Sequence, residues 1–115
     1  MEIEQWSVYW ANLDPALGSE QAGRRPVLVI SADAVNVLNT VTVLPLTSYK
    51  ESRRKIRVNE VLVGPEKIGI DRESVILGHQ IRTLDKARLE SVAGKIMDEE
   101  TKEAVIAALK VQLGI

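Results

Sequence analysis

Short segments rich in branched and aromatic residues follow one another along the chain as far as Ile96, and several alternate apolar and polar residues with a period of two. This pattern is typical of β-strands. In the first segment, Trp6, Val8 and Trp10 share one face. We predict strands over residues 6–13, 25–30, 40–47, 58–63, 74–82 and 89–96, with a short helical turn over 83–88.

Beyond Ile96 the apolar residues are spaced three and four apart, which predicts an amphipathic helix. Asp98 is a suitable N-cap, and Gly114 suits the residue that closes the helix. The expected apolar stripe consists of Val105, Ile106, Leu109 and Leu113. Strands followed by one helix predict a mainly β, α+β fold: a small, bent antiparallel barrel with the helix against it, as a single domain over residues 1–115.

A polar loop separates the first two predicted strands. Gly18 and Gly23 bracket it, and glycine tolerates backbone angles that other residues avoid. Ser19, Glu20 and Gln21 supply oxygens and an amide, and Arg24 and Arg25 place two permanent charges where the loop becomes a strand. A pair of cations at a strand mouth suits a phosphate ligand. The alternative is a surface turn with solvated arginines.

Strand register brings one of these cations next to a hydroxyl. If the strands over 25–30 and 40–47 form an antiparallel pair, Ile30 faces Thr42 and Arg25 faces Thr47. Opposed residues in such a ladder have Cβ atoms about 4.5–5.5 Å apart. We therefore expect the Arg25 guanidinium and the Thr47 hydroxyl to meet at one end of the sheet, under the glycine-bracketed loop.

A basic segment over residues 50–57 holds five basic residues and one acidic residue. It is either a solvated loop or a patch that steers phosphates toward the same sheet edge. On the second interpretation, Arg53 and Arg54 are candidate RNA contacts.

Composition narrows the chemistry. The chain has no cysteine and one histidine, His79, which excludes disulfides, cysteine-based zinc sites and histidine-cluster metal sites, and fits a reducing cytoplasm. No apolar run approaches the length of about 18 residues that a membrane span needs. The net charge is −1, so nucleic-acid binding requires a local patch. Core packing is favoured over base stacking for Trp6 and Trp10, and a packed or interface position is favoured over catalysis for His79.

Phosphoryl transfer on RNA suits the remaining groups, because RNA carries its own nucleophile, the 2′-OH. The protein then has to align that oxygen, stabilise the charge on the pentacoordinate phosphorus and help to move two protons. Arg25 is assigned charge stabilisation first and proton transfer second, since a guanidinium has a pKa above about 12.

The motifs of this chain resemble those of the MazF/PemK toxin family, in family order and over nearly the whole length. They are Val8-Tyr9-Trp10-Ala11-Asn12-Leu13-Asp14-Pro15, Gly18 to Ile30, Leu46-Thr47-Ser48, Asp71 to Leu77, Gln80 to Lys86 and Arg88-Leu89. The resemblance implies an SH3-like barrel and a homodimer. It also implies a metal-independent, cofactor-free endoribonuclease that cuts single-stranded RNA to 2′,3′-cyclic phosphate and 5′-OH ends. Such a toxin is neutralised by a cognate antitoxin.

The resemblance also assigns roles to residues. It maps the catalytic arginine and threonine onto Arg25 and Thr47, the loop that covers the site onto Ser19, Glu20 and Gln21, and a strand near the RNA groove onto Gln80 and Arg82. The full set of candidate RNA-binding residues is Ser19, Glu20, Gln21, Arg24, Ser48, Arg53, Arg54, Gln80 and Arg82.

The chain departs from the family pattern at two places. Trp6-Ser7 stand where the family usually has glycine and an acidic residue, and His79 stands where an acidic residue is common. The first change is expected to affect the start of the first strand or the dimer, and the second to affect base preference or interface charge. Two alternatives remain open: a CcdB-like toxin that binds gyrase, and a non-catalytic nucleic-acid-binding barrel.

Overall fold

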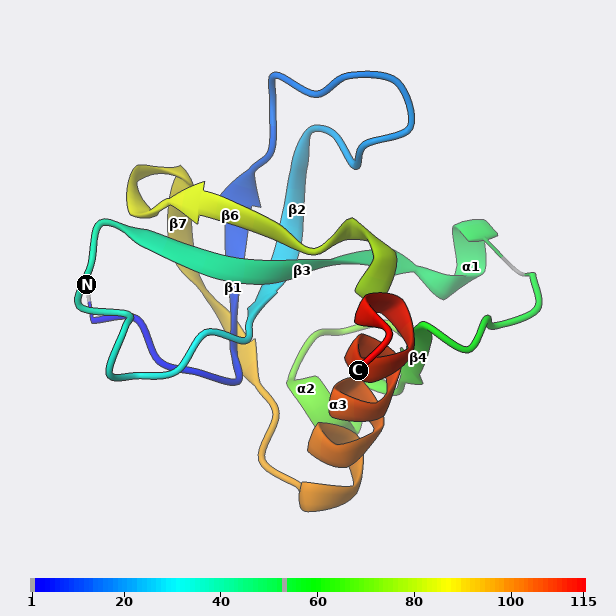
Figure 1. Ribbon diagram of the computed structural model, residues 1–115. Helices are drawn as coiled ribbons and strands as arrows, with labels where there is room; N and C mark the ends of the chain where they lie inside the picture. The colour runs from blue at the N-terminus through cyan, green and yellow to red at the C-terminus, as the bar shows by residue number, and fades with distance from the viewer. Residues whose placement is uncertain (1, 53) are drawn as a thin grey trace.

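Strand β3 (Thr40–Ser48) is the centre of the sheet in the computed structural model, which describes residues 2–52 and 54–115. It pairs with three other strands, and every strand pair is antiparallel. Within the described residues the sheet order is β4-β5-β3-β2-β1-β7, with β6 also on β3 (Figure 1). The other strands are β1 (Ser7–Asn12), β2 (Arg24–Val29), β4 (Glu60–Val63), β5 (Ser74–Leu77), β6 (Arg82–Asp85) and β7 (Leu89–Lys95).

Helices and turns connect these strands. Helix α3 (Glu99–Leu113) follows the last strand and packs under the sheet, so the predicted succession of strands and one C-terminal helix is confirmed (Figure 1). The shorter elements are α1 (Tyr49–Ser52), α2 (Pro65–Ile68) and the 3₁₀ turns η1 (Gly78–Gln80) and η2 (Lys86–Arg88). Within the described ranges, none of the helices combines the length and the apolar character that crossing a membrane requires.

The register between β2 and β3 is the one that the sequence predicts. Leu28 lies opposite Leu44, and Val27 lies opposite Pro45. At the far end of this ladder, the Ile30 N–H donates to the Thr42 carbonyl over 3.0 Å. The same register carried toward the start of β2 brings Arg25 toward Thr47.

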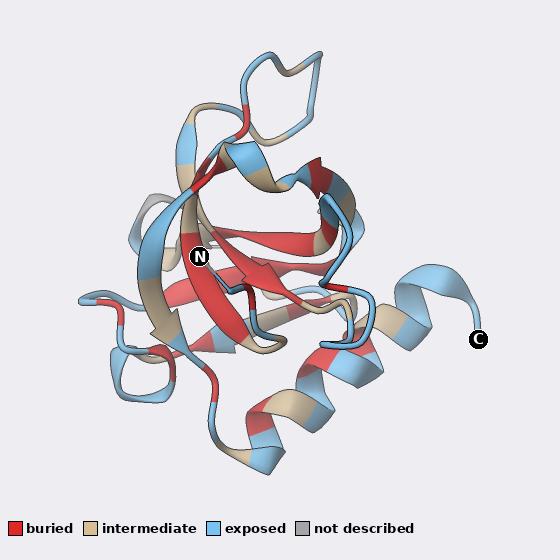
Figure 2. Cartoon of the chain, turned by 90° about the vertical axis from the view of Figure 1, so that its left-hand side faces the viewer, coloured by how far each residue is buried: buried red, intermediate tan, exposed pale blue. Residues whose placement is uncertain are grey.

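Both faces of β1 are buried, because the bent sheet encloses one core and α3 closes a second (Figure 2). Tyr9 and Ala11 pack into the first core, and Val8 packs into the second, as the period of two predicts. Trp6 packs against the second core from its edge, as predicted. Trp10 differs, since it is half-buried and its ring lines a surface cavity.

Helix α3 begins and ends as predicted, but its buried face is different. The Asp98 carboxylate accepts the Thr101 N–H at 2.9 Å, and Gly114 closes the helix with a left-handed φ of 69°. The buried positions are Thr101, Val105 and Ala108. Spacings of four and three put these on one face, whereas Ile106 and Leu113 are 42% and 52% exposed, so the predicted stripe was too wide.

The predicted single strand over 74–82 is wrong, because β3 has a different partner at each of its ends. β5 pairs with residues 46–48 of β3, and β6 pairs with residues 40–43. The chain makes the turn η1 to pass from one to the other. His79 is therefore exposed on a turn rather than packed in a strand, and the helical turn over 83–88 shrinks to η2.

Trp6 adopts a backbone conformation that favours glycine, with a φ of 71°. Its N–H donates to the Val29 carbonyl at 2.8 Å, and its carbonyl accepts the Ile96 N–H at 2.9 Å, so both neighbours hold it in place. The strain of about 1–2 kcal/mol is offset by packing of the indole against the core under α3. Trp6 therefore fixes the backbone at the start of β1.

Candidate active site

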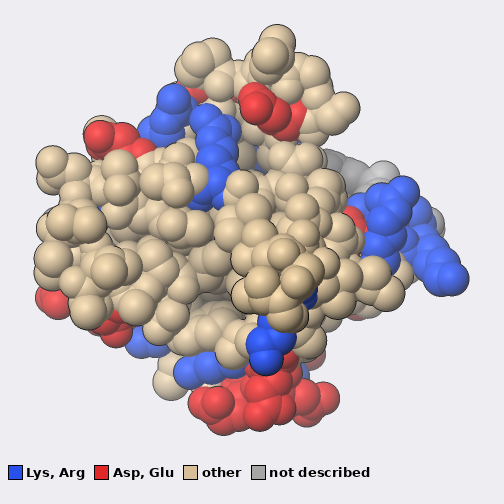
Figure 3. Space-filling model, in the orientation of Figure 1, with Lys and Arg blue, Asp and Glu red and all other residues tan. Residues whose placement is uncertain are grey.

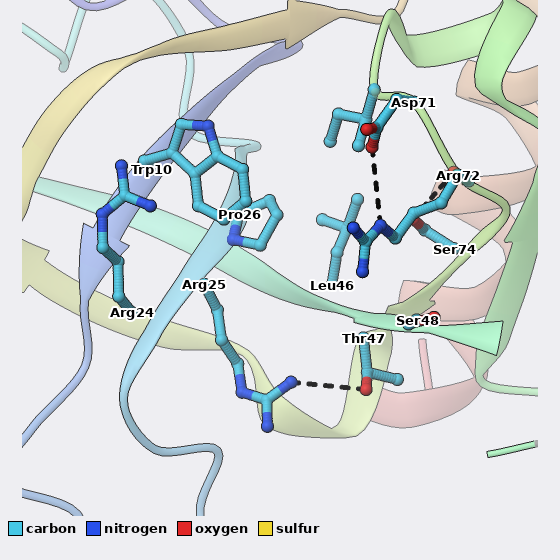
Figure 4. Close-up of a pocket in the computed structure, with 11 residues that line it drawn as sticks. Trp10, Arg24, Arg25, Pro26, Leu46, Thr47, Ser48, Asp71, Arg72 and Ser74 are labelled. Carbon is cyan, nitrogen blue, oxygen red and sulfur yellow. Dashed lines mark hydrogen bonds and ion pairs between the residues drawn. The ribbon is translucent and has the colours of Figure 1, made fainter. Parts of the chain in front are cut away.

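A cavity of about 410 Å³ opens at the edge of the sheet where β2 begins and β3 ends (Figure 4). Three segments form its walls: the start of β2, the end of β3 and the segment that leads into β5. The lining residues are Trp10, Arg24, Arg25, Pro26, Leu46, Thr47, Ser48, Ile70, Asp71, Arg72 and Ser74. Three of them are arginines and three carry hydroxyl groups, which makes the cavity suited to an anion.

Arg25 and Thr47 face each other in this cavity, as the register predicts (Figure 4). Arg25 Nη1 lies 3.4 Å from Thr47 Oγ1, and Arg25 Nε donates to the Ala22 carbonyl at 2.9 Å. The second bond fixes the guanidinium plane from the loop side. Since a guanidinium has five N–H donors, most of them remain available to a ligand. Both side chains are half-buried, so their charge and hydroxyl are only partly screened by water.

Arg24 points away from Arg25, because neighbouring residues of a strand alternate. Its guanidinium lies 4.5 Å from the centre of the Trp10 ring and pairs with Glu90 at 2.5 Å. Trp10 thus presents one edge of the cavity with a cation stacked on it. Arg24 is more constrained than Arg25, although both line the same cavity.

The loop over the cavity is held by its own side chains. Gly18 and Gly23 have φ values of 58° and 77°, which confirms the predicted need for glycine at the two ends of the polar segment. Asp14 Oδ1 accepts the Gly23 N–H at 3.0 Å. Glu20 Oε1 accepts the Leu17 N–H at 2.7 Å, so one oxygen of the carboxylate is used inside the loop.

Gln80 and Arg82, both predicted near the RNA groove, contact the backbone of this loop. Gln80 Oε1 accepts the Gln21 N–H at 3.3 Å, and Gln80 Nε2 donates to the Ser19 carbonyl at 3.1 Å. Arg82 Nη1 donates to the Leu13 carbonyl at 3.1 Å. A second cavity of about 300 Å³ lies below the loop and is lined by Glu20, Gln21, Pro45, His79, Gln80, Ile81 and Arg82.

Arg88 holds the base of the loop in place, a role that the sequence did not predict. Its Nη1 donates to the carbonyls of Asn12 at 3.2 Å and Asp14 at 2.5 Å, at the base of the loop. These contacts join residues more than 70 positions apart, so no local pattern announces them. Its place beside Leu89 in the matching motif is the one signal that marked it.

Arg54 of the basic segment has a structural partner. Both of its terminal nitrogens bond to Glu60, with Nη1–Oε1 at 2.6 Å, and the Glu60 side chain is 0% exposed. The Arg54 hydrogen bonds, with the Arg57 N–H, lower the pKa of Glu60 from 4.5 to about 2 despite its burial. Arg54 lines neither of the two cavities described above. Arg53 lies outside the described residues.

The charges of the molecule are distributed unevenly (Figure 3). Lys and Arg side chains lie beneath the loop at the top of the view and beside α1 at the right. Asp and Glu side chains gather at the bottom, where Glu99 and Glu100 open α3. The described residues contain no cluster of three His, Asp or Glu side chains that could hold a metal ion.

The third wall of the cavity comes from the Asp71–Leu77 motif, for which the sequence predicted no role. Asp71, Arg72 and Ser74 come from the segment before β5, and Ser48, a predicted RNA contact, lies beside them at the end of β3. The pairing of Ser48 with Ser74 in the β3–β5 ladder brings this segment to the cavity.

Comparison with known proteins confirms the resemblance. The sequence profile of the PemK-like, MazF-like toxin of type II toxin–antitoxin systems matches residues 4–113. Endoribonuclease EndoA of Bacillus subtilis (strain 168) is 36% identical over 115 residues, which cover 100% of this chain and 97% of that protein.

Solved structures agree with the sequence comparison. MazF (Form-I) from Deinococcus radiodurans matches with a TM-score of 0.81 at 30% identity, over 100% of this chain and 99% of that one. The MazE–MazF structure (Form-III) from the same organism matches with a TM-score of 0.76 at 28% identity, over 100% and 99% of the two chains. The chain described here therefore belongs to the PemK-like, MazF-like toxin family of type II toxin–antitoxin systems.

Proposed function

We propose that this chain is the toxin of a toxin–antitoxin pair and acts as a metal-independent endoribonuclease on single-stranded RNA. The observation that carries the proposal is the meeting of Arg25 and Thr47 across one arginine-lined cavity. Its relative EndoA is named an endoribonuclease, which supports RNA as the substrate. The cavity between Arg25 and Thr47 is the position that we propose for the scissile phosphodiester.

The reaction needs no nucleophile from the protein. The 2′-oxygen of the RNA attacks the adjacent phosphorus and loses its proton, and the bond from phosphorus to the 5′-oxygen breaks as that oxygen gains a proton. The products are a 2′,3′-cyclic phosphate and a 5′-OH. Arg25 N–H groups and the Thr47 hydroxyl stabilise the extra charge on the phosphoryl oxygens, and each well-placed donor lowers the barrier by about 3–4 kcal/mol.

The surrounding residues hold the RNA on either side of that phosphodiester. Arg24, Ser48 and Trp10 line the same cavity, where a base can stack on the exposed part of the indole. The loop side chains, with Gln80 and Arg82, form the second cavity and supply donors and acceptors to base edges. Arg54 is left out of the binding set, because Glu60 occupies its guanidinium.

We also infer that the active form is a homodimer in the cytoplasm, neutralised by a cognate antitoxin. The family description and the MazE–MazF structure of a relative support the antitoxin. Light scattering of the purified protein tests the dimer, and a monomer at micromolar concentration would contradict it.

Mapping the ends of cut RNA tests the proposed reaction. Purified protein is incubated with single-stranded RNA in excess EDTA, and the fragments are analysed by mass spectrometry. Fragments with 2′,3′-cyclic phosphate and 5′-OH ends, lost in Arg25→Ala and Thr47→Ala, are expected. Intact RNA together with trapped gyrase would instead support the CcdB-like alternative, and bound but uncut RNA would support the non-catalytic barrel.

A further inference from the structure

A third arginine enters the cavity from the wall opposite Arg24. Arg72 lies in the segment before β5, and its guanidinium points into the cavity toward the side where Arg25 and Thr47 meet (Figure 4). Its side chain is 62% exposed. Neither the register of β2 and β3 nor the proposed catalytic pair involves Arg72.

The three arginines of the cavity differ in how firmly they are held. Arg24 has a short ion pair and a stacking partner, and Arg25 donates to a carbonyl of the loop. For Arg72, the described residues provide one side-chain partner, Asp71, with Nε–Oδ1 at 3.5 Å. An exposed ion pair at this separation contributes little, so another anion replaces the carboxylate at small cost.

Asp71 is the single carboxylate among the residues that line the cavity, and it is 86% exposed. It stands as an anion beside a cation in a cavity whose other charged groups are positive. Its carboxylate thus marks a position where a negative oxygen is bound by Arg72. A phosphodiester oxygen has the same charge and accepts the same guanidinium bonds, in a geometry that can be bidentate.

We propose that Arg72 forms a second phosphodiester site, which binds a phosphate next to the one cleaved between Arg25 and Thr47. This inference rests on the proposed function. RNA entering the cavity displaces Asp71 from Arg72, and the guanidinium then fixes the strand on the β5 side. Arg72 is a binding residue for the substrate backbone, and it takes no part in moving protons at the scissile phosphorus.

The salt dependence of binding tests this site directly. Affinity is measured with an oligonucleotide of the cleaved sequence that carries 2′-O-methyl groups, so that it binds without being cut. Arg72→Gln removes one phosphate contact and should reduce the slope of log Kd against log salt by about 0.7. The same change should raise KM about tenfold and leave kcat within about twofold, since a hydrogen bond to a charged group is lost from both bound states. Arg72→Lys should keep the slope.

A matched pair of controls separates the site from general charge effects. Lys110→Gln removes a cation from the last turn of α3, outside the cavity, and should leave the slope and KM unchanged. Asp71→Asn removes the competing carboxylate and should tighten binding about threefold. In the Arg72→Gln background the Asp71→Asn gain should shrink, because the two side chains share one site.

The results separate failure of the second phosphodiester site from failure of the proposed function. If wild-type protein cleaves RNA while Arg72→Gln leaves both the slope and KM unchanged, the second site is wrong and the proposed function stands. A fall in kcat at saturating RNA with an unchanged slope would also overturn the second site, since it would put Arg72 at the scissile phosphate. If wild-type protein neither binds nor cuts RNA, the proposed function itself fails.

Discussion

Arg25 and Arg54 are both arginines in polar stretches of the sequence, yet their surroundings are opposite. Arg25 faces a threonine hydroxyl at 3.4 Å and a carbonyl at 2.9 Å in an open cavity. Arg54 is bonded by both terminal nitrogens to Glu60, whose side chain is 0% exposed. The Thr47 hydroxyl is neutral, so Arg25 keeps an uncompensated positive charge. The buried Glu60 carboxylate is negative and compensates the charge of Arg54. The partner, and not the count of basic residues, therefore decides which cation is available to RNA.

The difference also separates stability from activity. A buried carboxylate that loses its cation destabilises the folded state, so Arg54 contributes to the stability of the fold through Glu60. Arg25 can be removed without leaving a buried charge behind, because its partners are neutral. Substitutions at the two positions should therefore produce opposite phenotypes.

The largest expected effect is on cleavage by Arg25→Ala. Losing the charge-stabilising donors should lower kcat by about 10²–10³-fold. The free energy of unfolding should change by no more than about 0.5 kcal/mol, the range typical of surface substitutions. Single-turnover cleavage and urea titration measure the two quantities. Full activity in this variant would show that Arg25 is only a surface cation.

Arg54→Met should give the reverse result. It leaves Glu60 buried without its ion pair, and breaking a buried pair costs about 3–5 kcal/mol. We expect the lower end of this range, because Arg54 is 31% exposed and solvent screens it. Cleavage by the fraction that remains folded should be close to wild type. A loss of cleavage without a loss of stability would move Arg54 to the RNA site and overturn the contrast.

The Arg54–Glu60 ion pair should make the stability of the protein depend on pH. The pKa of Glu60 is about 2 in the folded protein and 4.5 without its partners, so the unfolded state binds more protons between these values. The stabilisation is complete above about pH 4.5 and is lost as the pH falls toward 2. After discounting for screening, the loss should be about 2 kcal/mol. Urea titrations from pH 7 to pH 3 measure this loss of unfolding free energy. The Glu60→Gln variant should not show this part of the pH dependence.

The smallest expected effect concerns the loop above Arg25. Gln80→Ala removes two hydrogen bonds to the loop backbone, each worth about 1 kcal/mol. Hydrogen exchange at the Gln21 amide should become faster, and kcat/KM should fall about fivefold. Gln112→Ala is the matched control, because this glutamine bonds to Asn59 and not to the loop. Unchanged exchange at Gln21 would show that Gln80 does not hold the loop.

Local patterns in the sequence were sufficient for much of this fold. Alternation fixed the two faces of β1, and the capping residues Asp98 and Gly114 fixed both ends of α3. The register between β2 and β3 was predictable as well, and with it the meeting of Arg25 and Thr47. These features depend on neighbours in the chain or on one strand pair.

Features that depend on the finished fold were not predictable. The break at η1 exists because β3 exchanges one partner for another along its length. Glu60 selects Arg54 from a run of similar cations only after the chain between them has folded. Gln80 reaches a loop 59 positions away, so its contact with Gln21 also requires the finished fold.

A double-mutant cycle on Arg25 and Thr47 tests the central claim most directly. Single-turnover cleavage rates of wild type, Arg25→Ala, Thr47→Val and the double variant are compared at saturating RNA, with folding checked by urea titration. If both side chains act on one phosphoryl group, the double variant should be much less impaired than the product of the two single effects. Effects that multiply independently would contradict a shared phosphodiester between the two residues.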